Sequence, residues 1–225
     1  MPISAADFLT EIRKLLGSAL LPQVHQSMQT FKLFEVFVFA LVREAARREG
    51  ACIRLLDENG NPVSHYLFRS SPGTLGRPQR NFTHAEIWFP GTEPLEAHVA
   101  VKVTGRAEVD HECDVVVLTQ SEADLARRDR GSPGYRKALL HIECKYYNGS
   151  IDISEGRGFL GLQVDLSKPV GFFVMNRQAQ SVETLIQTHR RVATPRVRPG
   201  NNDDVERLIG YLRQPFQRYA TTGKV

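Results

Sequence analysis

The spacing of hydrophobic and polar residues predicts helices at both ends of the chain and strands in between. The stretch "SAADFLTEIRKLLG" repeats apolar residues at helical spacing, with Ser4 and Asp7 as a capping box and Gly17 as the stop. A longer helix is predicted over about 27–49, since Gly50 follows it and its second half is charged. Its first half is apolar nearly all round, which predicts that this part is buried.

Alternating patterns predict strands through the middle of the chain. Residues 51–69 alternate around Asn59 and Gly60, which predicts a β-hairpin. Residues 70–94 are rich in Pro and Gly and hold one strand candidate, "FTHAEIWF", so we expect an insertion over about 51–94. Further strands are predicted in "LEAHVAVKV", "HECDVVVL", "ALLHIECKYY" and "PVGFFVMN". The last of these is uniformly apolar and is therefore expected to be central.

The remaining segments connect these strands or follow them. Residues 119–138 are polar and predict a long loop or a loop with a short helix, while "SEGRGFLGLQVDLS" predicts a helix. Two helices, about 179–191 and 203–219, form a helical C-terminal tail. The order of elements is helix, three strands, helix, strand, with an insertion after the first helix. Such an order predicts an α/β fold with a mixed central sheet flanked by helices.

Length and composition fit one soluble globular domain. The chain has 225 residues, and we expect a single domain with a core over about 27–176. Its 41% hydrophobic and 24% charged residues argue against disordered and fibrous classes. Three cysteines without a C-x-x-C pair argue against a disulfide framework and a zinc ribbon. Because neither a secretory signal nor a membrane-length apolar stretch is visible, we expect a cytoplasmic protein without a membrane partner.

Basic residues gather towards the C-terminus. The net charge of +4 is mild, but residues 186–225 hold eight Arg or Lys and three Asp or Glu, so the rest of the chain is close to neutral. Either this end is a solvated surface or it faces a polyanion. The loop "ARRDRGSPGYRK" is also basic. The candidate contacts to nucleic-acid phosphates, which would bind without reading sequence, are Arg127, Arg128, Arg130, Arg190, Arg191, Arg196 and Arg198.

Two of the apolar strands carry charges on one face. With a period of two, Glu143 and Lys145 point to the same side, as do Glu112 and Asp114 on the other strand. The opposite faces are small or apolar: Cys113, Val115, Val117 and Cys144. If the strands align, Asp114, Glu143 and Lys145 meet on one side of the sheet. Two close carboxylates repel unless a cation bridges them, and an oxygen-only pair suits Mg²⁺ or Mn²⁺. A lysine beside the pair can orient or activate a water.

This arrangement resembles the PD-(D/E)XK nuclease superfamily. The restriction-endonuclease-like core of that family runs helix, three strands, helix, strand; an acid opens the second strand, and an acid-x-Lys motif lies on the third. Asp114 matches the first acid, and "Glu143-Cys144-Lys145" matches the second motif. Glu35, alone in "LFEVFVFAL", matches the glutamate that many members add from the preceding helix. The Pro that gives the family its name is absent, and the interval from Asp114 to Glu143 is long.

The resemblance implies a metal-dependent endonuclease that hydrolyses phosphodiester bonds, mostly in DNA, as restriction or defence enzymes do. Glu35, Asp114 and Glu143 would hold one or two Mg²⁺ or Mn²⁺ ions, and Lys145 would act beside them. Cutting both strands of DNA favours a homodimer, and a further partner subunit is left open. The alternatives are a catalytically inactive nucleic-acid-binding or interaction module on the same fold and an enzyme acting on RNA or a nucleotide.

Several candidate residues also have structural interpretations. Glu143 and Lys145 could form a mid-strand ion pair on an exposed face. Glu112 competes for the role of the first acid. Glu35 could form a salt bridge with Lys145. Glu44, in the charged half of the same predicted helix, could take the place of Glu35 as a candidate acid.

Histidines and cysteines allow a zinc interpretation. The candidates are His98, His111, His141, Cys113 and Cys144. A single tetrahedral site cannot easily collect them, because alternation directs His141 and Cys144 to opposite sides of one strand. Gln163 lies on the helix after the Glu-x-Lys strand, where some relatives carry a polar residue that reaches the active site, but we expect it to be an exposed polar residue.

Overall fold

One mixed sheet organises the molecule. The computed structural model describes residues 4–17, 29–75, 82–167 and 169–225. Neighbours in the sheet follow the chain order: β1 (Cys52–Asp57), β2 (Thr83–Trp88), β3 (Leu95–Thr104), β4 (Asp110–Thr119), β5 (Ala138–Lys145), β6 (Val170–Met175) and β7 (Val192–Thr194). Each of the first four strands is antiparallel to the next, whereas β6 pairs in parallel with β5 and β7 pairs in parallel with β6.

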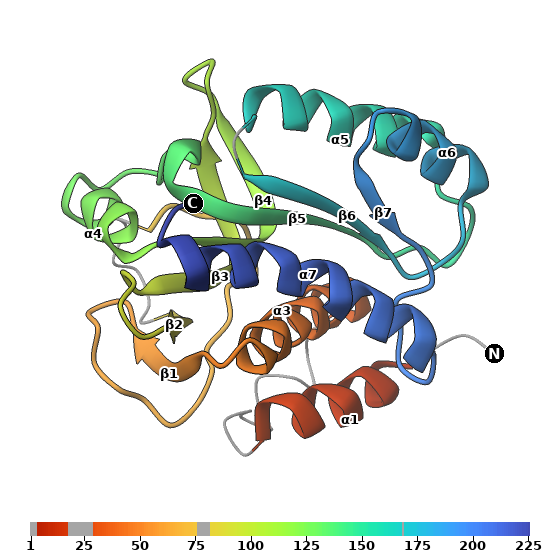
Figure 1. The fold of residues 1–225 in the computed structure, drawn as a ribbon. Helices are drawn as coiled ribbons and strands as arrows, with labels where there is room; N and C mark the ends of the chain where they lie inside the picture. Colours follow the sequence, from red (N-terminus) through yellow and green to blue (C-terminus); the bar gives the residue numbers. More distant parts are fainter. Residues whose placement is uncertain (1–3, 18–28, 76–81, 168) are drawn as a thin grey trace.

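Helices cover both faces of this sheet, as Figure 1 shows. One face carries α3 (Thr30–Arg48), with α1 (Ala5–Leu16) and α7 (Asn202–Thr222) packed against it. The other face carries α4 (Gln120–Arg128), α5 (Ile153–Asp165) and α6 (Gln180–Thr188). A single 3-10 turn, η2 (Tyr135–Lys137), precedes β5. The described residues therefore form an α/β structure in which six α-helices flank a mixed sheet. None of these helices has the length and apolar character needed to span a bilayer.

The largest part of the core lies under α3. This helix buries every residue from 33 to 42, as its apolar sequence predicts, and packs on the sheet while α1 and α7 cover its outer sides. Burying a phenylalanine such as Phe37 stabilises the fold, and truncating it to alanine typically costs about 3–5 kcal/mol. Two smaller clusters lie on the other face, one under α4 and one under α5 and α6.

The boundaries of α1 follow the predicted signals. The Ser4 hydroxyl accepts a hydrogen bond from the Asp7 backbone N–H, and the Asp7 carboxylate accepts one from the Ser4 N–H at 2.8 Å. Gly17 ends the helix with a φ of 65°, a left-handed value that favours glycine. The predicted capping box and stop are confirmed.

The predicted hairpin around Asn59 and Gly60 forms only in part. The chain reverses there, and backbone hydrogen bonds join Asp57 to Asn61 and Val63 to Leu55. The full-length partner of β1 is nevertheless β2, not residues 61–69. β1 and β2 thereby extend the main sheet at one edge, so the segment predicted as an insertion contributes two of its seven strands.

The alternation predicted for β4 is interrupted at Asp114. Val115 packs in the cluster under α3, whereas Cys113 packs with Val116 on the other face, so the prediction that Cys113 and Val115 share a face is wrong. The neighbouring strand switches faces at the same level, where Ala100 has a φ of 53°. A left-handed residue shifts the side-chain alternation of a strand, and Asp114 lies opposite this irregularity.

Candidate active site

The acids predicted from the sequence lie where β4 and β5 separate. The two strands are paired as far as Val115 and Ile142. Beyond that pair, the Asp114 carboxylate accepts a hydrogen bond from the backbone N–H of Cys144 at 2.7 Å, so a side chain replaces the next backbone contact. Glu143 lies on β5 beside this contact. We call the region around Asp114, Glu143 and Lys145 the fork site.

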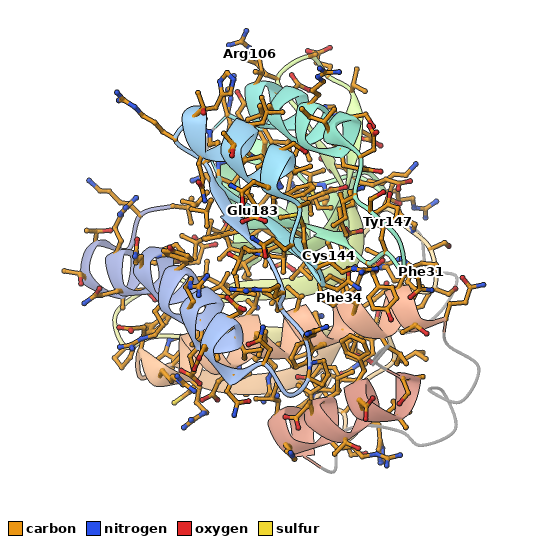
Figure 2. All side chains as sticks on the ribbon, turned by 90° about the vertical axis from the view of Figure 1, so that its right-hand side faces the viewer. Phe31, Phe34, Arg106, Cys144, Tyr147 and Glu183 are labelled. Carbon is orange, nitrogen blue, oxygen red and sulfur yellow. The ribbon has the colours of Figure 1, made fainter. Side chains whose placement is uncertain are left out.

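Glu35 reaches the fork site from the helical layer. The start of α3 packs against the end of β5, as Figure 2 shows with Phe34 and Cys144. The rings of Phe34 and Tyr146 lie 5.9 Å apart. Glu35 is 5% exposed, and the Lys32 ammonium donates to both of its oxygens at 2.8 and 2.9 Å. The salt bridge considered for Glu35 thus forms with Lys32, one helical turn away, rather than with Lys145.

The carboxylates at the fork site repel one another. Burial, followed by the charges of Glu35 and Glu143, raises the pKa of Asp114 to about 8, against the opposing effect of the Cys144 N–H. Burial also raises the pKa of Glu35 to about 6; Lys32 opposes this shift, while Glu143 and Glu112 add to it. The three acids are therefore close enough to act as one electrostatic group, although they come from α3, β4 and β5.

Lys145 is held by two carboxylates. Its ammonium lies 2.8 Å from Glu143 and 2.9 Å from Glu155, and the Tyr147 hydroxyl donates to the other oxygen of Glu155. Burial disfavours the Lys145 cation, but these two acids outweigh burial and raise its pKa above the ordinary value. Lys145 is therefore a fixed positive charge at the end of β5.

The faces of β5 follow the predicted alternation. Glu143 and Lys145 pair with Phe173 and Met175 of β6, whose side chains pack beneath α5 and α6. Cys144 instead packs against the cluster under α3, which confirms it as the packing side of the strand.

An oxygen-only group with excess negative charge suits a hard divalent cation. Glu35, Asp114 and Glu143 are the residues that could hold it, because a cation would relieve the repulsion that raises two of their pKa values. In this structure Lys32 and Lys145 each hold one of these acids. Lys32 contacts both oxygens of Glu35, whereas Lys145 contacts one oxygen of Glu143.

The competing acids have different surroundings. Glu112 is exposed on β4 and contributes to the field at Glu35. Glu44 faces away into a network with Arg47 and Arg48, whose hydrogen bonds outweigh its partial burial and lower its pKa to about 2. Glu44 thus has a structural role on the outer part of α3.

Sequence reasoning missed Lys32, Tyr147 and Glu155. Glu155 lies in the first turn of α5, just after the helix cap Asp152, where acids are common. Only the path of the chain from β5 into α5 shows that this acid reaches Lys145. For Lys32, the three-residue spacing to Glu35 was a usable signal in the sequence.

His111 and His141 contact other residues and do not share the zinc site considered from the sequence, and Gln163 is buried. His111 pairs with Asp165 at 2.5 Å, while His141 contacts Gln163. Gln163 is 3% exposed, so the expectation of an exposed residue is wrong; Gly171 leaves room for its amide, since any β-carbon there would meet it. Among the described residues, one trio of potential metal ligands has its atoms within 4.8 Å of one another: His84, Glu96 and His98.

The predicted phosphate contacts fall into two groups. Arg127 is turned inward: its guanidinium bonds Glu96 and Asp124, so it is not free for a phosphate. Four others are exposed, although Arg128 lies 3.5 Å from Asp129: Arg128, Arg130, Arg190 and Arg191. Arg198 is half-buried. Arg196 is exposed too, but it pairs with Asp204 at 3.0 Å.

The basic segment after β7 lies at the same sheet edge as the end of β5. The Asn176 N–H donates to the Lys145 carbonyl, and the Val197 N–H donates to the Met175 carbonyl. Val197 lies between Arg196 and Arg198, which line a polar pocket of about 530 Å³ together with Arg207 and the start of α7. Two strand spacings, or about 10 Å, separate β7 from β5 in the sheet.

In comparisons with protein-family models, curated proteins and solved structures, nothing matches this chain.

Proposed function

We propose that this protein is a metal-dependent endonuclease with a restriction-endonuclease-like fold, which hydrolyses phosphodiester bonds in DNA. The order of elements supports the fold assignment. An antiparallel run of β3, β4 and β5 leads through α5 to β6, which joins β5 in parallel. α3 precedes this unit and packs on it. With β3 as the first strand of the core, Asp114 falls on the second strand and Glu143 on the third, as in that family.

The observation that carries the proposal is the position of Asp114 and Glu143 where β4 and β5 separate, with buried Glu35 in the helix packed on them. Glu35, Asp114 and Glu143 repel one another in a partly buried position, where charge is expensive. A fold that needed only stability gains little from three acids there. In a site that binds a divalent cation, the same three acids serve as ligands. A function in metal binding therefore accounts for the free-energy cost of burying their charges.

The chain's residues would divide the chemistry between them. A divalent ion held by Glu35, Asp114 and Glu143 would polarise the scissile phosphate and lower the pKa of an attacking water. Asp114, fixed by the Cys144 N–H, would present its free oxygen in a set position. Lys145 is held protonated, so its role would be to stabilise developing negative charge or orient the water rather than to accept a proton. Glu155 and Tyr147 would keep the ammonium in place.

The basic surface supports DNA as the substrate. Arg198, which is half-buried, lines the pocket at the edge where β5 ends, and its guanidinium group suits a phosphate contact. Arg190 and Arg191 lie just before β7 on the same part of the chain. A restriction or defence role, a cytoplasmic location and a homodimer that cuts both strands follow from the same proposal.

Cleavage assays test this function. Plasmid and linear DNA are incubated with the purified protein and Mg²⁺ or Mn²⁺, with a chelator as the negative control. Asp114→Asn, Glu143→Gln and Lys145→Ala should each lose cleavage, while Glu44→Gln, which changes an acid on the outer part of α3, should retain it. Equal cleavage by wild type and the first three variants would reject the assignment and indicate a contaminating nuclease.

One observation favours the alternative of an inactive nucleic-acid-binding or interaction module. Lys32 and Lys145 already compensate two of the three acids without a metal. If this pairing is the functional state, DNA should bind with the same affinity in chelator and in Mg²⁺, and neither DNA nor RNA should be cut. Binding that strengthens with Mg²⁺ and is followed by cleavage distinguishes the enzyme from this module.

A further inference from the structure

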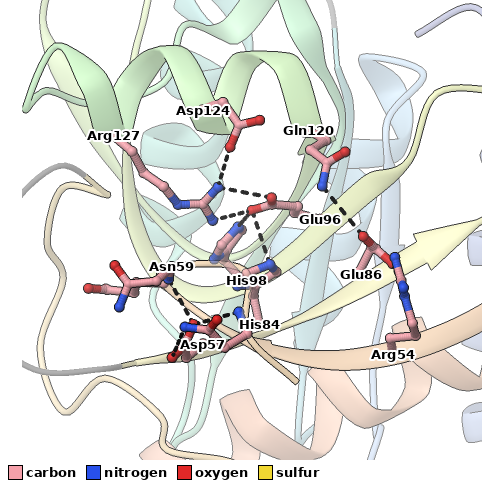
Figure 3. Close-up of polar contacts among 12 residues, drawn as sticks. Arg54, Asp57, Asn59, His84, Glu86, Glu96, His98, Gln120, Asp124 and Arg127 are labelled. Atoms are coloured by element: carbon pink, nitrogen blue, oxygen red, sulfur yellow. Dashed lines mark hydrogen bonds and ion pairs between the residues drawn. The ribbon is translucent and has the colours of Figure 1, made fainter. Parts of the chain in front are cut away.

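A second cluster lies on the sheet away from the fork site, under α4. Glu96 and His98 alternate on β3, and the antiparallel register of β2 and β3 sets His84 opposite His98. The rings of His84 and His98 stack with their centroids 4.8 Å apart (Figure 3). All three side chains lie on the face opposite α3, and their exposed fractions are 1%, 1% and 5% for His84, Glu96 and His98.

His84 is the unexplained member of this cluster. Neither of its ring nitrogens has a hydrogen-bond partner in the structure, although both are buried. Its Nε2 lies 3.5 Å from the Glu96 carboxylate, too far for a good hydrogen bond but aimed at the same oxygen that His98 contacts at 2.8 Å. Buried polar groups are nearly always satisfied, so two free nitrogens on one ring call for a missing partner.

We propose that His84, Glu96 and His98 bind a transition-metal ion, Zn²⁺ or a similar borderline cation, at a site separate from the fork site. The spacing of the ligand atoms supports this. Donors bonded to one ion at about 2.0–2.1 Å lie roughly 3.0–3.4 Å from one another in octahedral or tetrahedral geometry. The two distances to the Glu96 oxygen, 2.8 and 3.5 Å, bracket that range. Small movements of the side chains would therefore complete the site.

The donor types select the metal. Two imidazole nitrogens and one carboxylate suit Zn²⁺, Fe²⁺, Co²⁺ or Ni²⁺, whereas Mg²⁺ takes oxygen ligands and keeps its water. The fork site offers the opposite set, with carboxylates alone. One chain would thus hold two kinds of ion without competition between them. This inference does not depend on the proposed nuclease function.

Arg127 fits the site as an outer partner of the ligating carboxylate. Its two terminal nitrogens bond the two oxygens of Glu96, and Asp124 holds the same guanidinium at 2.9 Å. With an ion on the oxygen that faces the histidines, Arg127 would keep its bond to the other oxygen, 3.0 Å away. Outer partners of this kind orient metal ligands and are often as important as the ligands.

The site would be filled during folding. The ligands come from two paired strands and are covered by α4, whose Ala123 and Ala126 belong to the adjoining apolar cluster. An ion bound there links β2 to β3 and, through Arg127, to α4. Binding free energy at a buried site of this kind becomes part of the free energy of folding. Exchange with metal in solution should therefore be slow in the folded protein.

The test is refolding with defined metals. The full chain is unfolded in denaturant with a chelator, freed of chelator, and refolded with Zn²⁺, with Mg²⁺ or with no divalent metal. We expect about one equivalent of Zn²⁺ to remain after gel filtration and the midpoint of thermal unfolding to rise by several degrees. His84→Phe should lose both effects. His141→Phe, at an equally buried histidine outside the cluster, should keep them.

X-ray absorption of the wild-type protein, loaded with Zn²⁺, tests the ligands even if a variant fails to fold. The spectrum should show two imidazoles and light-atom ligands without sulfur, and Co²⁺ loading should give visible absorption bands. Zn²⁺ ligated by sulfur or by oxygen alone would overturn the proposal, as would wild-type protein that retains no more Zn²⁺ than His84→Phe.

Discussion

The two clusters on the sheet differ in their side chains and in their exposure to solvent. The fork site gathers carboxylates at the separating ends of β4 and β5, where the site is partly open. The cluster of His84, Glu96 and His98 lies on paired strands and is sealed by α4. Position in the sheet therefore separates a partly exposed group of acids from a group of ligands that is almost entirely buried.

Burial shifts pKa values in both clusters, upward for an acid of the fork site and downward for a histidine of the other cluster. It raises the pKa of Asp114 to about 8, with the charges of Glu35 and Glu143 adding to the effect. In the other cluster it lowers the pKa of His84 to about 3. Both shifts favour the uncharged form, as desolvation requires. At the fork site, Lys32 and Lys145 compensate Glu35 and Glu143, which leaves Asp114 without an ion-pair partner among the described residues, whereas in the other cluster Arg127 compensates Glu96. Asp114 is therefore the acid whose ionisation a bound cation would favour most.

The largest expected effect separates the two clusters by substitution. Glu143→Gln should lower DNA cleavage by on the order of 10²–10³-fold, because it removes one of the proposed metal ligands, and should leave retained Zn²⁺ unchanged. His84→Phe should remove Zn²⁺ but, once folded, cleave in Mg²⁺ close to the wild-type rate. Metal analysis and initial rates on the same preparations measure both. If either substitution abolishes both properties in a folded protein, the clusters are not independent.

A pH series examines the repulsion at the fork site. The pKa of Asp114 is near its ordinary value of 3.8 in the unfolded chain and about 8 in the folded protein. The stability that this group contributes is therefore full below about pH 4 and is lost as the pH rises towards 8. In chelator, Asp114→Asn should therefore unfold a few degrees above wild type at pH 8.5 and show no such gain at pH 4. Mg²⁺ should reduce the difference by stabilising the ionised wild type.

Thermal unfolding followed by circular dichroism gives these midpoints. Asp110→Asn, which changes an exposed acid at the start of the same strand, serves as the control. It should change the midpoint of thermal unfolding by the same amount at both pH values. A wild-type midpoint that stays level from pH 5 to pH 8.5 in chelator would contradict the repulsion inferred here.

Much of the fold could be predicted because its signals are local. The cap at Ser4 and the apolar runs of α3 and β6 each depend on neighbours in the sequence. The pairing of β1 with β2 could not be predicted, because it joins strands across a long Pro- and Gly-rich segment whose length sets no register. The face switch at Asp114 depends on a left-handed Ala100 on the neighbouring strand, a conformation that alanine rarely adopts.

The candidate sites show the same limit. Glu143 and Lys145 were found because a period of two predicts which residues share a face. His98 was noticed, but His84 and Glu96 were not grouped with it, since only the register of β2 and β3 brings them together. Arg127 was predicted to contact phosphate because charge on a loop suggests exposure, yet the helix α4 turns it onto Glu96.

A smaller effect is expected from the residue that positions Lys145. Glu155→Gln removes one of the two carboxylates that hold the ammonium, while keeping the hydrogen bond from Tyr147. Cleavage should fall by about 10-fold, mostly in kcat, since the substrate-binding surface is unchanged. The alkaline limb of the pH–rate profile should also move to lower pH, because Glu155 is one of the two acids that raise the pKa of Lys145.

The conservative variant and a neighbour test whether Glu155 acts through Lys145. Glu155→Asp should recover part of the rate, and Asp152→Asn, which keeps a good helix cap in the same turn, should have little effect. A fall in rate with an unmoved pH profile would assign Glu155 a structural role only.

The smallest effect concerns DNA affinity at the edge beside the fork site. Arg198→Ala should lower the slope of log K against log salt by about 0.9 if its guanidinium contacts one phosphate, with only a few-fold loss of affinity at low salt. Arg213→Ala, on α7 and paired with Glu49, should leave the slope unchanged. Arg127→Met should also keep the slope, because Arg127 belongs to the buried cluster. Filter binding to a short duplex in chelator measures all three, and a changed slope for Arg127→Met alone would reverse the assignment of these two arginines.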